Sequence, residues 1–327
     1  MRALIVRGSR NIFTVRPFPA GVSAEAEVLT EAGGGELECR IRGKVLKGVE
    51  GYYNPLAPGD WVSVAPDGAH PGKGLILSLE ERKNTFVRFN QKGRAPQLLA
   101  ANMDLILCVT TPLSPPFRPR FLDRVLLQGD LSGIPPVILL NKCDLVREGA
   151  DPDVEERLSE FGRIGYRVLR VSALSGEGLG ELRALLRGKY AVLVGQSGVG
   201  KSSLVNALLS RSEIRVGALN EKYDRGNHTT SQGMMVEIPA GAETIRLIDT
   251  PGIRRFVPWG TGAAELIFHL REFSPLAGTC SYGLSCSHRT EPGCKIMEAV
   301  AAGVIHEDRY ESFLRIQDEL ARGNYDE

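Results

Sequence analysis

The strongest constraint on the fold is an eight-residue stretch, GQSGVGKS, which runs from Gly195 to Ser202. It fits the pattern G-x-x-x-x-G-K-[ST], follows the apolar run YAVLVG and precedes a segment of helical character. Glycines in such a loop let successive backbone N–H groups point at phosphate oxygens, and the following helix adds the positive end of its dipole. The stretch therefore predicts a strand, a phosphate-binding loop and a helix in succession.

The segments around this loop alternate between strand-like and helix-like patterns. From Met103 onward, the apolar runs typical of buried strands are MDLILCVTT, PPVILLNKCDL, YRVLRVSAL, YAVLVG, MMVEIP and TIRLIDT. Apolar residues recur at helical spacing in RPRFLDRVLLQGDLS, DPDVEERLSEFGRIG and GEGLGELRALLRG. Strands that alternate with helices indicate a mostly parallel sheet with both faces covered.

The 327 residues suffice for two or three domains, and the pattern divides them into four parts. Residues 1–80 hold short β-like segments punctuated by Gly and Pro, which fit a small barrel or a sandwich equally well. Residues 81–98 carry five Arg or Lys against one acid, and form either a basic patch or a solvated linker. Residues 99–260 form the α/β domain, and residues 261–327 combine helical segments with a Cys/His cluster. The expected fold class is a multidomain α/β protein.

Composition narrows the class of protein further. The formal net charge is +1, so any surface for nucleic acid or membrane must be local. No apolar run approaches the ~20 residues that would span a bilayer, and MRALIVRGSRNIF lacks the length and cleavage site of a signal peptide. We expect a cytosolic monomer with no membrane partner.

The tetrapeptide NKCD predicts which base is bound. Asp144 can accept hydrogen bonds from the N1–H and the exocyclic amine of guanine, a donor pair that adenine lacks. Asn141 offers a carboxamide to the base edge, and the stem of Lys142 can lie on the face of the ring. Cys143 fills a variable position and is expected to have no redox role.

The stretch VSALSGEG supports the same reading, because a backbone N–H at Ser172 or Ala173 can meet the guanine O6. Together with Asp249 and Gly252 of IDTPG, these stretches predict a GTP site. Its expected members are Asn141, Lys142, Cys143, Asp144, Ser172, Ala173, Gly195, Gln196, Ser197, Gly198, Val199, Gly200, Lys201, Ser202, Ser203, Asp249 and Gly252.

The triphosphate and its Mg²⁺ need charged and hard-oxygen groups, which the same stretches supply. Lys201 places a positive charge against the β- and γ-phosphates, and the Ser202 hydroxyl suits Mg²⁺. Asp249 can reach the ion through a water, and Thr229 or Thr230 is the natural further ligand. The pattern leaves the choice between the two threonines open.

GTP hydrolysis is expected to be slow unless a further group orients the attacking water. Many GTPases place a Gln after the aspartate turn to orient the attacking water, but here the residue after Gly252 is Ile253. Another group must therefore orient the water, and His228, in the expected loop YDRGNHTTSQG, is one expected catalytic residue. Lys201, whose charge lies against the β- and γ-phosphates, is the other. The alternative for His228 is a plain loop residue or an RNA contact.

These stretches come in the order NKCD, VSAL, GQSGVGKS, HTT and DTPG, whereas the phosphate loop comes first in ordinary GTPases. Chain order does not fix spatial order, and joining domain ends while cutting elsewhere is tolerated. The N- and C-termini of an ordinary GTPase domain would be joined at residues 187–190. The permuted domain would instead be cut open just after DTPG. Both flanking domains would then meet the GTPase beside the loop that senses the γ-phosphate.

The chain resembles the circularly permuted, ribosome small-subunit-dependent GTPases, the RsgA or YjeQ family. The resemblance covers essentially the whole chain and rests on NKCDL, GQSGVGKSSLVN, RGNHTT, DTPGIRRF and the trailing Cys/His cluster. It implies an N-terminal RNA-binding OB-fold, a circularly permuted P-loop GTPase and a C-terminal zinc domain. It also implies a role in late maturation of the small (30S) ribosomal subunit, with 16S rRNA bound in the GTP form.

The trailing stretch CSYGLSCSHRTEPGC predicts a structural Zn²⁺ site. Three thiolates and one imidazole, from Cys280, Cys286, His288 and Cys294, make a closed tetrahedral set. The first gap is one residue longer than in the family pattern, and Gly283 within it can absorb the extra residue. Three reduced core cysteines are the alternative.

Two other classes of function remain open at this point. The chain can be an RNA-binding assembly placeholder for which hydrolysis only times release, or a signalling GTPase with protein partners. The expected barrel and the basic segment favour RNA, because OB-folds bind single strands through basic grooves and stacking side chains.

Overall fold

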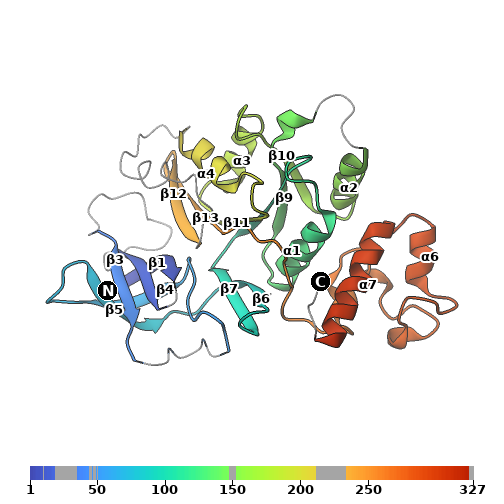
Figure 1. The fold of residues 1–327 in the computed structure, drawn as a ribbon, viewed down its shortest axis with the longest axis horizontal. Helices are drawn as coiled ribbons and strands as arrows, with labels where there is room; N and C mark the ends of the chain where they lie inside the picture. The colour runs from blue at the N-terminus through green and yellow to red at the C-terminus, as the bar shows by residue number, and fades with distance from the viewer. Residues whose placement is uncertain are drawn as a thin grey trace.

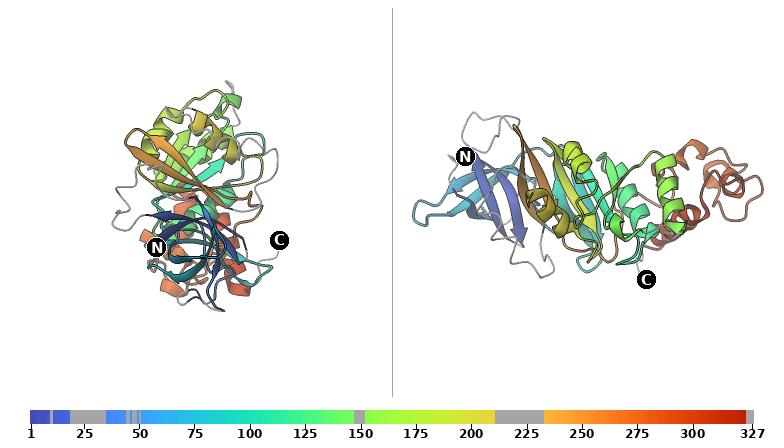
Figure 2. Two further views of the ribbon diagram at one scale, coloured as in Figure 1. Left: turned by 90° about the vertical axis from the view of Figure 1, so that its left-hand side faces the viewer. Right: turned by 90° about the horizontal axis from the view of Figure 1, so that it is seen from above.

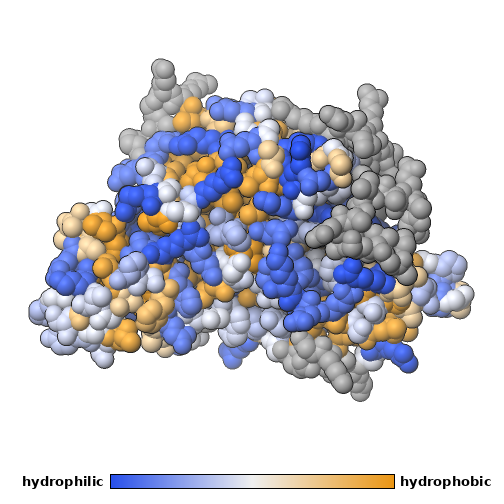
Figure 3. All heavy atoms as spheres, turned by 180° about the vertical axis from the view of Figure 1, so that it is seen from behind, coloured by the Kyte–Doolittle hydropathy of each residue, from blue (hydrophilic) through white to orange (hydrophobic). Residues whose placement is uncertain are grey.

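The structure is a computed structural model that describes residues 1–9, 11–18, 35–43, 46, 49, 51–146, 152–210 and 233–323. A β-barrel, a central sheet flanked by helices and a C-terminal helical module follow one another along the long axis (Figures 1 and 2). Seen from behind, hydrophilic and hydrophobic residues are interspersed along the length of the molecule (Figure 3). Among the described residues, the helices are too short or too polar to cross a bilayer.

The N-terminal strands close into a barrel, so the sandwich alternative is wrong. The order is β1-β2-β3-β5-β4, and pairing of β1 with β4 completes the ring. Neighbours are antiparallel except β3 and β5, which run parallel, and this connectivity is that of an OB-fold. Alternate side chains such as Phe13, Val15 and Val62 fill the interior. The strands are β1 (Arg2–Ser9), β2 (Ile12–Phe18), β3 (Leu37–Ile41), β4 (Trp61–Pro66) and β5 (Lys73–Leu79).

A hairpin of β6 (Thr85–Asn90) and β7 (Ala95–Ala101) occupies most of the segment expected as a basic linker. Phe86 stacks on Phe256 with ring centroids 5.7 Å apart, and Phe89 on Trp259 at 5.5 Å. The hairpin therefore packs against the chain just after DTPG.

Several of the basic side chains in this segment have partners. The Arg82 guanidinium donates to both carboxylate oxygens of buried Asp60, at 2.7 and 2.8 Å. Lys83 pairs with Asp104 at 2.7 Å, and Arg88 donates to Gln97. Burial lowers the pKa of Arg88. The segment is therefore a folded connector in which part of the positive charge is neutralised. Its basic surface is smaller than the count of Arg and Lys in the sequence indicates.

The central sheet has the order β10-β9-β8-β11-β13-β12. Its strands run parallel except β12, which is antiparallel to β13. They are β8 (Leu105–Thr110), β9 (Pro136–Leu140), β10 (Arg167–Arg170), β11 (Tyr190–Gly195), β12 (Met234–Ala240) and β13 (Glu243–Asp249). Near-continuous burial of β8, β9 and β11 is what a parallel sheet covered on both faces requires.

Helices cover the two faces of this sheet in pairs. The pair α1 (Pro119–Leu131) and α2 (Pro152–Arg163) packs on one face, where Phe121 and Phe161 meet Ile106 and Ile138. The other face carries α3 (Leu179–Leu186) and α4 (Lys201–Ser210). The first face shares its core with Leu4, Val6 and Trp61 of the barrel strands. The barrel interior is a separate cluster, so the two domains pack against each other through a buried interface.

The barrel also continues the sheet. β1 pairs with β12 antiparallel, with Arg7 opposite Met234, so one eleven-stranded sheet runs through both domains. Arg16 of β2 forms an ion pair with Glu237 of β12, and Arg246 of β13 donates to the same carboxylate at 3.0 Å.

The C-terminal module is helical, as its pattern predicts. It consists of the 3₁₀ turns η2 (Leu266–His269), η3 (Ser274–Leu276) and η4 (Gly283–Ser285), with α6 (Lys295–Ala301) and α7 (Glu307–Arg322). α7 lies beside α1 (Figure 1). Buried Arg309 of α7 bonds Asp123 of α1 at 2.8 Å and Glu272 at 2.6 Å, which ties the module to the central domain.

Candidate nucleotide site and metal centre

The expected GTP-binding stretches meet at one edge of the central sheet. NKCD follows β9, SAL follows β10, the P-loop follows β11 and DTPG follows β13. Carboxyl ends of parallel strands share one edge, which is where ligands of open α/β sheets bind. The topology therefore assembles the stretches in space despite their order in the chain.

The P-loop backbone has the conformation that its glycines predict. Gly198 and Gly200 have φ of +83° and +89°, a region that side chains rarely adopt. A Cβ on Gly200 would lie 2.4 Å from the Asn141 amide nitrogen. Lys201 is buried, which lowers its pKa, and its ammonium donates to the Gly195 and Gln196 carbonyls at 3.1 Å each.

Asn141 acts as a strut between loops, a role that the sequence did not suggest. Its Nδ2 donates to the Val199 carbonyl at 2.8 Å, and its Oδ1 accepts from the Ala173 N–H at 3.2 Å. The Lys142 ammonium donates to the Gly198 carbonyl at 2.9 Å and to the Ser114 carbonyl at 2.6 Å. NKCD therefore holds the P-loop and the SAL loop together.

The groups expected to read the base differ in accessibility. The Asp144 side chain is exposed in η1 (Cys143–Leu145). Burial raises the pKa of the Cys143 thiol to about 11, which supports an unreactive thiol. The Ser172 N–H is used within its own loop, bonded to the Glu177 carbonyl at 2.9 Å. The Ala173 N–H, with its longer bond to Asn141, is the better candidate to meet guanine O6.

Two of the expected Mg²⁺ ligands are adjacent. The Ser202 hydroxyl donates to the Asp249 carboxylate at 2.7 Å, so a pair of hard oxygens lies at the start of α4. Next to them, Thr250 is buried and donates to the Leu193 carbonyl at 2.6 Å, which fixes the DTPG turn on β11. The oxygen chemistry of this pair fits Mg²⁺. Thr229, Thr230 and His228 lie outside the described residues.

The DTPG turn is docked on the P-loop. A Cβ on Gly252 would lie 2.7 Å from the backbone N and Cα of Ser197, so only glycine fits there. The Ile253 N–H donates to the Gly195 carbonyl at 3.1 Å, and its side chain is buried in the core. Ile253 therefore cannot face an attacking water, in agreement with the sequence argument. Ser203 is exposed in the first turn of α4.

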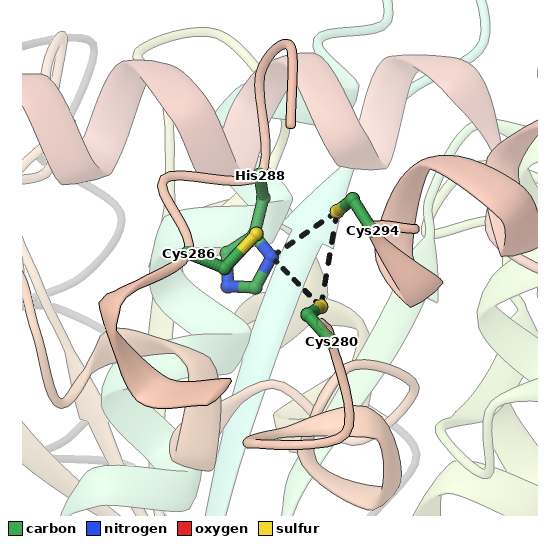
Figure 4. Close-up of side chains that lie close together, drawn as sticks. All are labelled: Cys280, Cys286, His288 and Cys294. Carbon is green, nitrogen blue, oxygen red and sulfur yellow. Dashed lines mark hydrogen bonds between the residues drawn. The ribbon is translucent and has the colours of Figure 1, made fainter. Parts of the chain in front are cut away.

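A second site lies in the C-terminal module, where three cysteines and a histidine converge (Figure 4). All four side chains are buried, and one ligand atom from each lies within 4.8 Å of the others. The set comprises Cys280, Cys286, His288 and Cys294. Gly283, in the long gap, has φ of +54°, and its N–H donates to the Cys280 carbonyl at 2.8 Å.

The spacing of these atoms fits one tetrahedral metal ion. The Cys280 and Cys294 sulfurs are 3.8 Å apart, and the His288 Nδ1 lies 3.6 and 3.4 Å from them. Zn–S bonds of ~2.3 Å and a Zn–N bond of ~2.0 Å at tetrahedral angles put such atoms about 3.8 and 3.5 Å apart. The Lys295 N–H donates to the Cys280 sulfur at 3.3 Å, as suits a thiolate, and the Tyr310 hydroxyl holds the His288 carbonyl at 2.6 Å.

Three residues whose hydrogen bonds support these sites were not predicted from the sequence. Thr250 was hidden inside the DTPG pattern, Ser114 in a Pro-rich turn, and Tyr310 in an ordinary helical repeat. Their contacts join residues 22 to 57 positions apart, and the periodicity of the sequence carries no signal for such pairs.

Comparisons with known proteins agree with this geometry. A family model described as RsgA GTPase matches residues 79–259. The chain is 37% identical over 303 residues to a small ribosomal subunit biogenesis GTPase RsgA of Chlorobaculum parvum, covering 90% of this chain and 95% of that protein. It is 40% identical over 265 residues to the RsgA of Alcanivorax borkumensis, covering 81% and 73%.

Solved structures give the same result for the fold. The crystal structure of YjeQ from Thermotoga maritima matches with a TM-score of 0.66 and 27% identity, over 98% of both chains. A structure described as YloQ, a circularly permuted GTPase, matches with a TM-score of 0.62 over 100% of this chain and 96% of that one. At 21% identity, the second match speaks for the fold alone.

Proposed function

The chain belongs to the RsgA GTPase family, a family of GTP-hydrolysing enzymes, and we propose that it acts in late maturation of the small ribosomal subunit. In this proposal the protein binds 16S rRNA of the 30S subunit in its GTP form. The subunit stimulates hydrolysis, and hydrolysis drives release. The names of the relatives support the subunit as partner.

The observation that carries the nucleotide assignment is the pair of hydrogen bonds made by Asn141. One joins NKCD to the P-loop carbonyl of Val199 and the other joins it to the SAL loop at Ala173. A base-reading motif held against a phosphate loop is the arrangement that one nucleotide spanning both would need. Exposed Asp144 beside this strut would then select guanine by accepting from N1–H and the exocyclic amine.

On this reading the P-loop N–H groups and Lys201 hold the phosphates. The Lys201 ammonium, which now bonds two loop carbonyls, would turn to the β- and γ-phosphates. Ser202 and Asp249, with Thr229 or Thr230, would hold Mg²⁺, which neutralises charge on the β- and γ-phosphate oxygens when bound. The Gly252 N–H would meet the γ-phosphate.

The attacking water must be positioned by a group other than Ile253, whose side chain is buried. We assign this role to His228 of the stretch YDRGNHTTSQG, acting with Lys201. An enzyme that lacks a fixed water-orienting side chain hydrolyses slowly alone, and ordering by a partner is worth roughly 10³–10⁵-fold in other GTPases.

In the C-terminal module, Cys280, Cys286, His288 and Cys294 would hold one structural Zn²⁺ per chain. Four protein ligands leave no open position, so the ion would stabilise the module rather than take part in catalysis. A module stabilised in this way keeps α7 packed on α1.

The test is the rate of GTP hydrolysis by the full chain with and without small ribosomal subunits. We expect a rate well below ~1 s⁻¹ alone and a strong increase with small subunits, but none with large subunits at equal concentration. ATP should replace GTP in neither condition. Stimulation by a protein partner and not by small subunits would replace this proposal with a signalling function.

A further inference from the structure

A cavity of about 430 Å³ opens beside the nucleotide site, between the start of α1 and the chain that follows DTPG. Gln196 of the P-loop and Asp308 of α7 complete its wall. We call it the arginine pocket, since the side chains that define it are Phe117, Arg118, Arg120, Arg124, Arg254 and Arg255.

The charge of this pocket exceeds what its neighbours neutralise. Five arginines line it against one acid, Asp308, which itself lies 3.7 Å from buried Arg157. Glu311 pairs with Arg120 at 2.6 Å, and Glu319 pairs with Arg124 at 2.7 Å.

Glu319 also lies 3.4 Å from Arg255, so it serves two arginines. The remaining two, Arg118 and Arg254, are exposed, and no ion pair joins either to an acid within the part of the chain that the structure describes. The arginine pocket therefore carries a net positive charge, and Arg118 and Arg254 on its wall are the main source of it.

Two further features suit this cavity to phosphate on a nucleic-acid strand. α1 begins at Pro119, so the positive end of its dipole adds to the arginine charge. Half-buried Phe117 lies on the wall and offers a ring to a base. Guanidinium forks match phosphate geometry, and unpaired RNA bases stack on aromatic side chains. The carboxylates of an acidic peptide would match the charges but would bring no base to stack on the ring.

We propose that the arginine pocket binds phosphodiester groups of an RNA strand of the small ribosomal subunit. This deepens the proposed function and rests on it. Arg254 is two residues from Gly252, and the Ile253 between them is bonded to the P-loop at Gly195. A strand held by Arg118 and Arg254 therefore bridges α1 and the loop that would sense the γ-phosphate, and so ties RNA contact to the nucleotide.

The experiment measures affinity of the full chain for small ribosomal subunits, with a non-hydrolysable GTP analogue, across a range of salt. The test variant carries Arg118→Ala and Arg254→Ala. The matched control carries Arg187→Ala and Lys189→Ala, which removes equal charge at the opposite edge of the sheet, before β11. GTP affinity of each variant reports whether it is folded.

We expect the test variant to bind small subunits roughly tenfold more weakly for each arginine lost. Its log–log salt slope should shrink by about 0.7–0.9 for each phosphate contact removed, while the control matches wild type. Binding equal to wild type, with an unchanged salt slope, would overturn the pocket and leave the proposed function standing. Wild type that fails to bind small subunits would overturn both.

A second measurement separates RNA from protein as the occupant. A photocrosslinking Phe117→p-benzoylphenylalanine substitution, irradiated in the complex with small subunits, should attach to rRNA. Attachment to ribosomal protein alone would overturn RNA as the occupant and identify an acidic protein segment instead.

Discussion

Single residues of the nucleotide site differ in how much room the backbone around them leaves. The Asp144 side chain is exposed, whereas a Cβ on Gly252 would lie 2.7 Å from the P-loop backbone at Ser197. Substitution at the first position should change which base binds, and substitution at the second should change how the γ-phosphate is sensed.

The Asp144→Asn variant should lose guanine affinity by about 1.5–3 kcal/mol, the range for a hydrogen bond to a charged group. It should gain xanthine affinity, because the new amide can donate to the xanthine C2 carbonyl. Titration with GTP, XTP and ATP checks both, with Asp153→Asn at the exposed start of α2 as control. Wild type that bound ATP as tightly as GTP would refute the role of NKCD.

The Gly252→Ala variant should lose its preference for GTP analogue over GDP by about 1–3 kcal/mol, the cost of an unmade hydrogen bond. The new methyl would lie 2.7 Å from Ser197 backbone atoms and push the turn off the P-loop. Gly262→Ala is the control, because nothing lies within 4 Å of its Cβ position. Equal affinities for both nucleotides in wild type and variant would show that Gly252 does not sense the γ-phosphate.

At the scale of elements, α1 and α7 are joined by ion pairs of two kinds. Arg120 and Glu311 are both nearly half exposed, whereas Arg309 and Asp123 are buried. A surface pair contributes little, and breaking a buried pair leaves a charge without compensation.

The Arg309→Ala variant should therefore lose about 3–5 kcal/mol of stability, since buried Asp123 and Glu272 both lose the hydrogen bonds of the guanidinium and only Arg157, 3.7 Å away, stays near Asp123. Arg120→Ala, across the same helix pair, should cost about 0–1 kcal/mol. Urea unfolding followed by circular dichroism measures both values. Equal small losses would mean that apolar packing alone holds the two helices together.

The cysteine cluster gives a prediction for the C-terminal module. Purified protein should carry one zinc per chain, and Cys286→Ala should release it and lower the melting temperature of the module. Cys39→Ala, at a buried thiol of the barrel interior, should leave the metal content unchanged. Elemental analysis that found no zinc in reductively prepared wild type would return the cluster to ordinary core cysteines.

Elements with a strong local pattern were predictable, and those fixed by distant contacts were not. Apolar runs such as β8 and β9 reveal buried strands, and glycine spacing reveals the P-loop. The hairpin β6–β7 was missed, because its charges suggested a linker while Phe86 and Phe89 are buried or stacked by partners some 170 residues away. The structural role of Asn141 was missed for the same reason. Its residue type predicts a contact with the base, but its two hydrogen bonds to distant loops make it a strut.

At the scale of the whole molecule, barrel and GTPase share one sheet. β1 pairs with β12, and Glu237 of β12 holds Arg16 of the barrel and Arg246 of β13. β13 ends at Asp249, an expected Mg²⁺ ligand, so the barrel is two strands away from the nucleotide. Deleting residues 1–80 would remove Trp61 and expose both β12 and the central core that packs on Trp61. A point substitution is therefore the cleaner probe of coupling.

The Glu237→Gln variant tests this path. If the nucleotide state reaches the barrel through β12 and β13, wild type should bind small subunits more tightly with GTP analogue than with GDP, by the 5–150-fold typical of coupled sites. Removing the charge that holds Arg16 and Arg246 together should reduce that ratio several-fold while GTP affinity stays near wild type.

Glu243→Gln is the control, because Glu243 begins β13 at its far end and its contact with Arg187 is exposed and 3.7 Å long. The measurement is subunit affinity in both nucleotide states for the three proteins. A ratio that survives Glu237→Gln would mean that the coupling runs through the chain just after DTPG and the hairpin β6–β7, which contact each other directly through Phe256 and Phe86.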